Sequence, residues 1–218
     1  MWWSEKVRGD QLAEYALLHG YTFRREVPTN TTGDWWGMLV GASQAPTDGA
    51  AEVSLFNRGS SRRVRYEFRR GTEHGELIIF EYQFTTGSGK NRSTHTFSVA
   101  ILDSRLAIPR VEIHPQTFLH VMGKGLGMQD IELESDEFNR AFVVKASEER
   151  FAFDFLTPEM MEWCLRQRFL SMEVVYGDFI IYQAGQLSLD FVGESERHLN
   201  GVLERIPGYV RQDFGGSN

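Results

Sequence analysis

Arginines are concentrated in one short segment of this chain, although the protein as a whole is acidic. Six of them fall between residues 58 and 70, in a sequence whose formal net charge is −7. On an extended strand, Arg63, Arg65 and Arg69 would share the face opposite the neighbouring aromatic residues. Guanidinium groups bind phosphate and carboxylate through paired hydrogen bonds. The segment therefore predicts a site for an anionic ligand.

Two further cations extend this predicted site at the tip of the next hairpin. Lys90 and Arg92 lie in the polar segment 85–92, and a hairpin folding back along the arginine strand would add them to the same patch. The residues of the predicted anionic site are Arg63, Arg65, Arg69, Lys90 and Arg92. A second interpretation stays open, in which the arginines form cross-strand ion pairs with Glu67 and Glu81. Such pairs are common on solvated sheet faces and stabilise them weakly.

Other residues capable of chemistry lack the surroundings that the chemistry needs. Gly87-Ser-Gly-Lys90 is similar to a phosphate-binding loop, but it lacks the first glycine of that motif and the Ser or Thr after its lysine. His114 and His120 have no third metal ligand nearby in the sequence. Cys164 lies on the apolar side of an expected helix, which is typical of a buried, unreactive thiol. We therefore expect no catalytic residue, no metal site and no cofactor.

Period-two alternation of apolar and polar residues places the arginines on an antiparallel sheet. Strands are expected at 63–69, 76–84, 93–102, 110–114, 130–134 and 141–145, with a later hairpin joining 172–176 to 179–182 through Gly177-Asp178. Strands cluster in the sequence instead of alternating with helices. This order predicts an α+β fold, in which an antiparallel sheet meander is covered by packed helices.

Capping residues and apolar stripes indicate where those helices lie. A first helix is expected over 4–19, and a second begins at Thr157-Pro158, where a hydroxyl cap precedes a proline. A C-terminal helix is expected between Leu189 and Ile206, which bound its apolar stripe. The expected core residues are Phe80, Tyr82, Phe97, Val99, Phe142, Val144, Ile180 and Leu203.

The chain divides into three segments by its pattern of elements. Residues 1–50 contain an N-terminal helix, short strands and a loop, and residues 51–125 contain the antiparallel meander. Residues 126–210 have the order strand, helix, hairpin, helix, and we expect them to form one compact unit with the meander.

The composition is that of a globular protein, with 41% hydrophobic and 24% charged residues. A net charge of −7 gives no strong signal for nucleic-acid binding. The single cysteine cannot form an internal disulfide, and no apolar run has the length of a membrane span. We therefore expect a cytoplasmic protein without a transmembrane segment.

Part of the chain resembles an uncharacterised bacterial family, one of the domains of unknown function. The residues that carry the resemblance are 131–144, Ala152, 156–162 and 179–182, with Phe80-Glu-Tyr82, the Thr-Gly-Ser-Gly tip and Thr96-Phe97 before them. The resemblance covers about the last two thirds of the chain. Members often carry membrane-spanning helices ahead of this domain, and this chain departs from them in that respect. The family has no known activity, so the resemblance implies no catalytic residues.

Two functions from different classes are compatible with these observations. The first is a non-enzymatic interaction or binding module, whose sheet or hairpin tip binds an unknown protein partner or an anionic surface. Such a protein would be cytoplasmic, with peripheral attachment to the membrane as one arrangement. The second is a hydrolase-like enzyme with a site assembled from dispersed residues. The absence of nucleophile–base and metal-ligand spacings favours the first.

Overall fold

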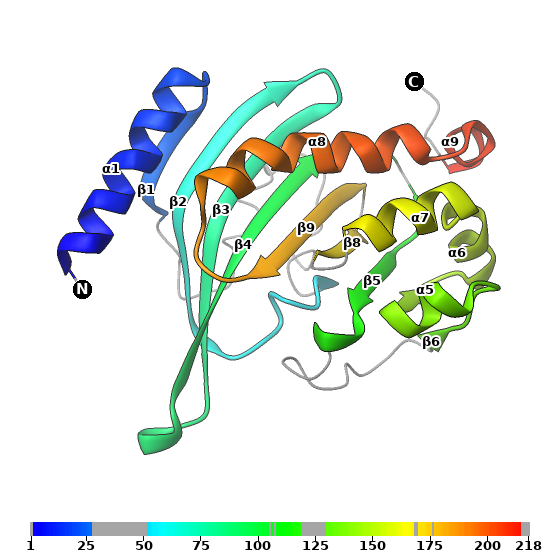
Figure 1. Ribbon diagram of the computed structural model, residues 1–218, viewed down its shortest axis with the longest axis horizontal. Helices are drawn as coiled ribbons and strands as arrows, with labels where there is room; N and C mark the ends of the chain where they lie inside the picture. The colour runs from blue at the N-terminus through cyan, green and yellow to red at the C-terminus, as the bar shows by residue number, and fades with distance from the viewer. Residues whose placement is uncertain are drawn as a thin grey trace. The chain divides into compact units, whose positions relative to one another are not determined.

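The computed structural model describes residues 2–27, 52–104, 106, 108–118, 130–167, 170–175 and 177–214 (Figure 1). The chain divides into two compact units. The first comprises Met1–Asp103 and Tyr182–Glu196, and the second comprises Ser104–Ile181 and Arg197–Asn218. The division at residues 50 and 125 that the sequence pattern predicts stays a prediction.

The first unit contains the predicted meander. Its strands are β1 (Thr22–Val27), β2 (Ser60–Thr72), β3 (Gly75–Thr86) and β4 (Ser93–Asp103), followed in the sheet by the end of β9 (Asp178–Ala184). The first four strands form three antiparallel pairs, β1 with β2, β2 with β3 and β3 with β4. The three strands expected at 63–69, 76–84 and 93–102 are thus confirmed, and each is longer than the range that alternation predicts.

Both faces of this sheet are covered. On one face, Phe80 and Tyr82 of β3 contact Phe56, at ring-centroid distances of 6.2 Å and 5.0 Å. On the other face lies helix α1 (Trp2–Leu18), which buries Leu12 and Ala16. This second face also carries Glu81, to which Arg8 of α1 is hydrogen-bonded. The alternation of β3 therefore separates an aromatic face from a face with a buried charge.

A β-bulge interrupts the pairing of β2 with β3. Arg65 lies opposite Glu81, whereas Phe68 lies opposite Ile79, so two residues of β2 face one residue of β3 between these pairs. Tyr66, inside the bulge, has a φ of +52°, in the left-handed region that non-glycine residues seldom adopt. The extra residue reverses the alternation of side chains in the second half of β2.

The second unit continues the antiparallel pairing with shorter strands. Its strands β5 (Val111–Pro115), β6 (Asp130–Ile131), β7 (Phe142–Ala146) and β8 (Ser171–Val175) are ordered β9-β8-β5-β7-β6. Its helices are α5 (Asp136–Ala141), α6 (Glu149–Phe155), α7 (Pro158–Arg166), the second half of α8 (Leu189–Arg205), and α9 (Gly208–Phe214). The sequence thus predicts the α+β class and the C-terminal helix correctly.

Three short helices, α5, α6 and α9, are not predicted from the sequence, and the strand expected at 130–134 ends at Ile131. Helix α5 begins after Ser135, whose side chain accepts a hydrogen bond from the Phe138 backbone N–H. Helices of six and seven residues, such as α5 and α6, bury too few residues for a helical period to be visible in the sequence. Tertiary packing, in which Phe138 and Phe151 are fully buried, stabilises them instead.

The three helices predicted from caps and stripes are present as α1, α7 and α8. The Thr157 hydroxyl accepts a hydrogen bond from the Met160 N–H at 3.3 Å, as expected for the cap of α7. Helix α8 contacts α7 at Gly201, where an added Cβ would lie 2.7 Å from Nε1 of Trp163. All eight predicted core residues are buried, whereas Leu189, the first residue of the predicted stripe, is 37% exposed. Within the described ranges, no helix combines the length and the apolar character of a membrane span.

Candidate functional site

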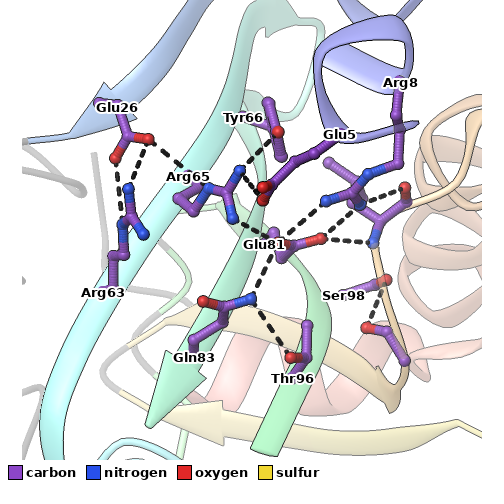
Figure 2. Close-up of polar contacts among 12 residues, drawn as sticks. Glu5, Arg8, Glu26, Arg63, Arg65, Tyr66, Glu81, Gln83, Thr96 and Ser98 are labelled. Atoms are coloured by element: carbon purple, nitrogen blue, oxygen red, sulfur yellow. Dashed lines mark hydrogen bonds and ion pairs between the residues drawn. The ribbon is translucent and has the colours of Figure 1, made fainter. Parts of the chain in front are cut away.

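A buried charged site of the first unit is centred on Glu81 (Figure 2). Its side chain is 0% exposed. Arg8 of α1 donates two hydrogen bonds to the carboxylate, at 2.6 Å and 3.3 Å. The backbone N–H of Leu187 and the side-chain amide of Gln83 donate two more, at 3.1 Å and 3.2 Å. The charge is therefore compensated by groups from three separate parts of the chain.

Arg65, a residue of the predicted anionic site, lies beside Glu81. It forms an ion pair with Glu5 of α1, and its guanidinium lies 3.6 Å from Glu26 and 3.9 Å from Glu81. Burial lowers the pKa of Arg65, but the hydrogen bond and charge of Glu5, together with the charge of Glu81, leave this pKa raised above its ordinary value. Arg65 is therefore a permanently charged, internally paired group.

Tyr66 lies between the two arginines of this cluster. The guanidinium carbons of Arg8 and Arg65 are 4.7 Å and 4.6 Å from its ring centroid, and Arg65 also donates a 2.6 Å hydrogen bond to its hydroxyl. A Cβ added at Gly9 of α1 would lie 3.2 Å from the Tyr66 ring. The bulge, the two arginines and the close approach at Gly9 together hold α1 against β2.

The other two strand arginines also have carboxylate partners. Arg63 donates to Glu26 at 2.7 Å and 3.2 Å. Arg69 lies 2.8 Å from Glu67 and 2.9 Å from Glu76. Glu67 is buried and also accepts two 2.8 Å hydrogen bonds from Arg24 of β1. Each strand arginine of the predicted site is thus bound to carboxylates of its own chain, and anion binding by these three residues stays a prediction.

The shared arginine face expected from the sequence does not form, because the bulge reverses the alternation of β2. Arg65 is opposite Glu81 and Arg69 is opposite Ile78, which point to opposite faces of β3. Arg65 is moreover buried, as are its partner Glu81 and the nearby Glu67. The cross-strand ion pair that the sequence left open is present between Arg65 and Glu81. Glu67 instead binds Arg69 of its own strand and, across the strands, Arg24 of β1. Two further partners of Arg65 come from other elements, Glu5 from α1 and Glu26 from β1.

Lys90 and Arg92 have a different environment from the strand arginines. Lys90 belongs to the single-turn helix η1 (Gly89–Asn91) at the hairpin tip, and both side chains are exposed. Arg92 contacts the Ser61 hydroxyl at 3.3 Å. Arg58 is half-buried, and its Nε donates a 3.3 Å hydrogen bond to the Ser54 carbonyl. Its backbone lies near the base of the tip, since a Cβ added at the neighbouring Gly59 would be 2.4 Å from the Thr85 carbonyl oxygen. In the part of the chain that the structure describes, no carboxylate forms an ion pair with these three cations.

The second unit has a buried polar cluster on β5 and its neighbours. His114 Nε2 is 3.3 Å from Glu112 and 4.0 Å from Glu173, and Arg110 is 2.6 Å from Glu112. Lys145 of β7 lies opposite Glu112 in the antiparallel pairing of β5 with β7. Among the described residues, no group of three or more His, Cys, Asp or Glu side chains has an arrangement that could hold a metal ion. The position of His120 falls outside the described residues.

Glu112 should contribute a pH-dependent part of the stability. Burial raises its pKa, but the hydrogen bond and charge of His114, with the charges of Arg110 and Lys145, lower the pKa below the ordinary 4.5. A carboxyl group with a lowered pKa stabilises the fold above its unfolded pKa, and this contribution is lost as the pH falls through the folded pKa. We expect the loss of unfolding free energy in Glu112→Gln to be largest near neutral pH and to shrink below about pH 4.5.

Urea unfolding of wild type and Glu112→Gln between about pH 7 and pH 3 measures this difference. Glu132→Gln, at an exposed carboxylate of the same unit, is the matched control for the loss of one negative charge. A difference between wild type and Glu112→Gln that stays constant over the whole range would contradict the lowered pKa.

A small apolar pocket lies on the other face of β5. It is lined by Ile113, Phe142, Trp163, Cys164, Gln167, Leu170, Met172 and Ile181. The space has room for about one water molecule. Burial raises the pKa of Cys164 to about 12, so its thiol is protonated at physiological pH. Because Glu112 and His114 alternate with Ile113 along β5, they point away from this pocket. The pocket therefore does not bring a nucleophile and a base together.

Three comparisons with known proteins place this fold. No family model matches the chain, and no curated protein matches it. Its fold is similar to the crystal structure of the mycobacterial trehalose monomycolate transport factor A, TtfA, with a TM-score of 0.60 and 10% sequence identity. The similarity covers 91% of this chain and 96% of that chain. At this identity the likeness concerns the fold, which the two chains share over nearly their whole lengths.

Proposed function

We propose that this protein is a non-enzymatic binding protein that acts with a protein partner in a transport process. The observation that carries the proposal is the shared fold with a transport factor over 91% of this chain. Shared folds host different functions, so the proposal extends only to this broad role and not to the cargo of TtfA. The resemblance to a family that is often membrane-anchored favours a place at the cytoplasmic side of a membrane.

The roles of the charged residues are consistent with this proposal. Glu81 and Glu67 are bound by arginines from their own chain, and the Glu112 cluster points away from the described pocket. An enzyme needs titratable groups that converge on a cavity able to hold a substrate. A binding protein needs a rigid framework, which buried ion pairs with several hydrogen bonds supply.

Photo-crosslinking in the native cells tests the proposed function. A photoreactive amino acid is placed at one exposed position at a time, at Asn91 of the hairpin tip, at Leu17 of α1 and at Arg150 of α6. We expect an adduct with a protein of a transport system from one of these surfaces and none from the others. Adducts of equal yield from all three positions, or hydrolysis of generic ester, phosphate or peptide substrates by the purified protein, would overturn the proposal.

A further inference from the structure

The geometry points to the end of the β3–β4 hairpin as a binding site for the phosphate headgroups of an anionic membrane surface, with Lys90, Arg92 and Arg58 as its cations. This inference deepens the proposed function by naming a surface on which the protein would meet its partner. It retains Lys90 and Arg92 of the site predicted from sequence. It leaves out the three strand arginines, because their guanidinium groups are bound to internal carboxylates.

The tip of the hairpin extends past the end of β1 on its β3 side and past the end of β9 on its β4 side (Figure 1). Strand β1 ends at Val27, which lies opposite Val64 of β2, and Val64 in turn lies opposite Tyr82 of β3. Beside β4, Gly185 donates its N–H to the Thr96 carbonyl, and Thr96 is level with Gln83. Among the described residues, the first residues of β2 accompany the hairpin beyond Gln83, as far as the pairing of Ser60 with Thr85. The three further residues of β3, at about 3.3 Å each, carry the tip about 10 Å past Val27 and Gly185.

The end of the hairpin is positively charged although the chain is acidic overall. The segments 57–63 and 85–96, which β2–β3 pairing brings together at Ser60 and Thr85, contain no aspartate or glutamate. Charges in water at physiological ionic strength are screened over about 8 Å. An extension of about 10 Å therefore lets the tip approach an anionic surface while the rest of the first unit's negative charge is screened from it.

The residue types of the tip favour lipid phosphates over nucleic acid. Arginine binds phosphate oxygens with its planar fork, lysine adds a mobile point charge, and Thr86 and Ser88 supply hydroxyl donors. The segment 85–94 has no aromatic side chain, so it offers no platform on which nucleic-acid bases could stack. It also has no large apolar side chain to insert among acyl chains. Binding at this site is therefore electrostatic and reversible by salt.

Vesicle flotation with the full chain tests the site. The probes are vesicles of phosphatidylcholine alone and of phosphatidylcholine with phosphatidylglycerol, at low and high salt. We expect wild type to bind the anionic vesicles at low salt only. Lys90→Gln/Arg92→Gln should lower the partition coefficient about 30-fold, at a factor of about five for each charge lost near the surface. Adding Arg58→Gln should lower it further.

A matched control separates the site from the effect of net charge. Arg150→Gln/Arg166→Gln also removes two positive charges, from side chains that are 90% and 57% exposed on α6 and α7. This control variant should bind the anionic vesicles as wild type does. Unchanged urea unfolding of both double variants establishes that they fold.

Three outcomes would overturn the inference. They are no binding of wild type to anionic vesicles at low salt, an equal loss of binding in the control variant, and binding of a mixed oligonucleotide in preference to the vesicles. Each of these outcomes is independent of whether the protein forms a crosslink with a partner in cells. Failure of the lipid site is therefore distinguishable from failure of the proposed function.

Discussion

Replacing Glu81 with alanine should lower the free energy of unfolding by about 3–5 kcal/mol. The carboxylate is fully buried and accepts hydrogen bonds from Arg8, Gln83 and the backbone of Leu187. Its removal leaves a guanidinium in a partly buried position without its anion, and leaves a backbone N–H without its acceptor. Both groups then bear the cost of lost hydration with no compensating interaction. Urea unfolding of the purified variant measures the effect.

A double-mutant cycle assigns this loss to the ion pair with α1. If Arg8 and Glu81 act together, Arg8→Met/Glu81→Leu should be destabilised by less than the sum of its two single changes, by at least about 1 kcal/mol. Arg150→Ala, in an exposed pair with Asp154 at 3.7 Å, is the control and should change stability by less than about 0.5 kcal/mol. A loss below about 1 kcal/mol in Glu81→Ala would show that water replaces the ion pair at little cost.

Replacing Phe80 with alanine should cost about 3–5 kcal/mol of unfolding free energy, the range for a fully buried phenylalanine. The ring is buried on the aromatic face of β3, stacked 6.2 Å from Phe56, and its backbone is paired with Val99 of β4. Truncation removes apolar area from the core and leaves a cavity that the flanking strands of a paired sheet cannot close. The loss is therefore larger than the transfer free energy of the ring alone.

Urea unfolding with an exposed aromatic control tests the Phe80 prediction. Phe153→Ala, at a ring that is 44% exposed in α6, should lose much less stability than Phe80→Ala. A loss below about 1 kcal/mol for Phe80→Ala would place the ring outside the rigid core. Glu81 and Phe80 are neighbours in sequence but point to opposite faces of β3, so the two substitutions probe the α1-covered face and the Phe56-covered face separately.

Local sequence patterns determine most of the secondary structure of this protein. Alternation with period two is sufficient to locate β2, β3 and β4, because apolar residues recur at every second position in part of each strand. A cap and a proline locate the start of α7 at Thr157, since both act within one turn of the chain. The exposed position of Lys90 and Arg92 is likewise predictable, because glycine and hydroxyl residues around them favour a turn.

The identity and partners of the candidate site depend on tertiary structure. One extra residue at the Tyr66 bulge reverses the alternation of β2, and no local pattern in the sequence marks that insertion. As a result, Arg65 and Arg69 lie on opposite faces of the sheet, although their spacing predicts a single face. The sequence identifies Glu67 and Glu81 as neighbours of these arginines because Glu67 lies on the same strand and Glu81 on the next one. Spacing along the sequence does not identify the partners of Arg65 that α1 and β1 supply.

Charge pairing is decided by which segments the fold brings together. Glu5 and Glu26 reach Arg65 from residues about 60 and 40 positions away in the chain, and the Leu187 N–H reaches Glu81 over 106 positions. Arg58 joins Lys90 and Arg92 only because Gly59 passes against the end of β3. The sequence alone therefore determines which elements form and where the charges lie along them. Only the tertiary structure decides which arginines are neutralised inside and which stay available at the tip, because contacts between distant segments settle that division.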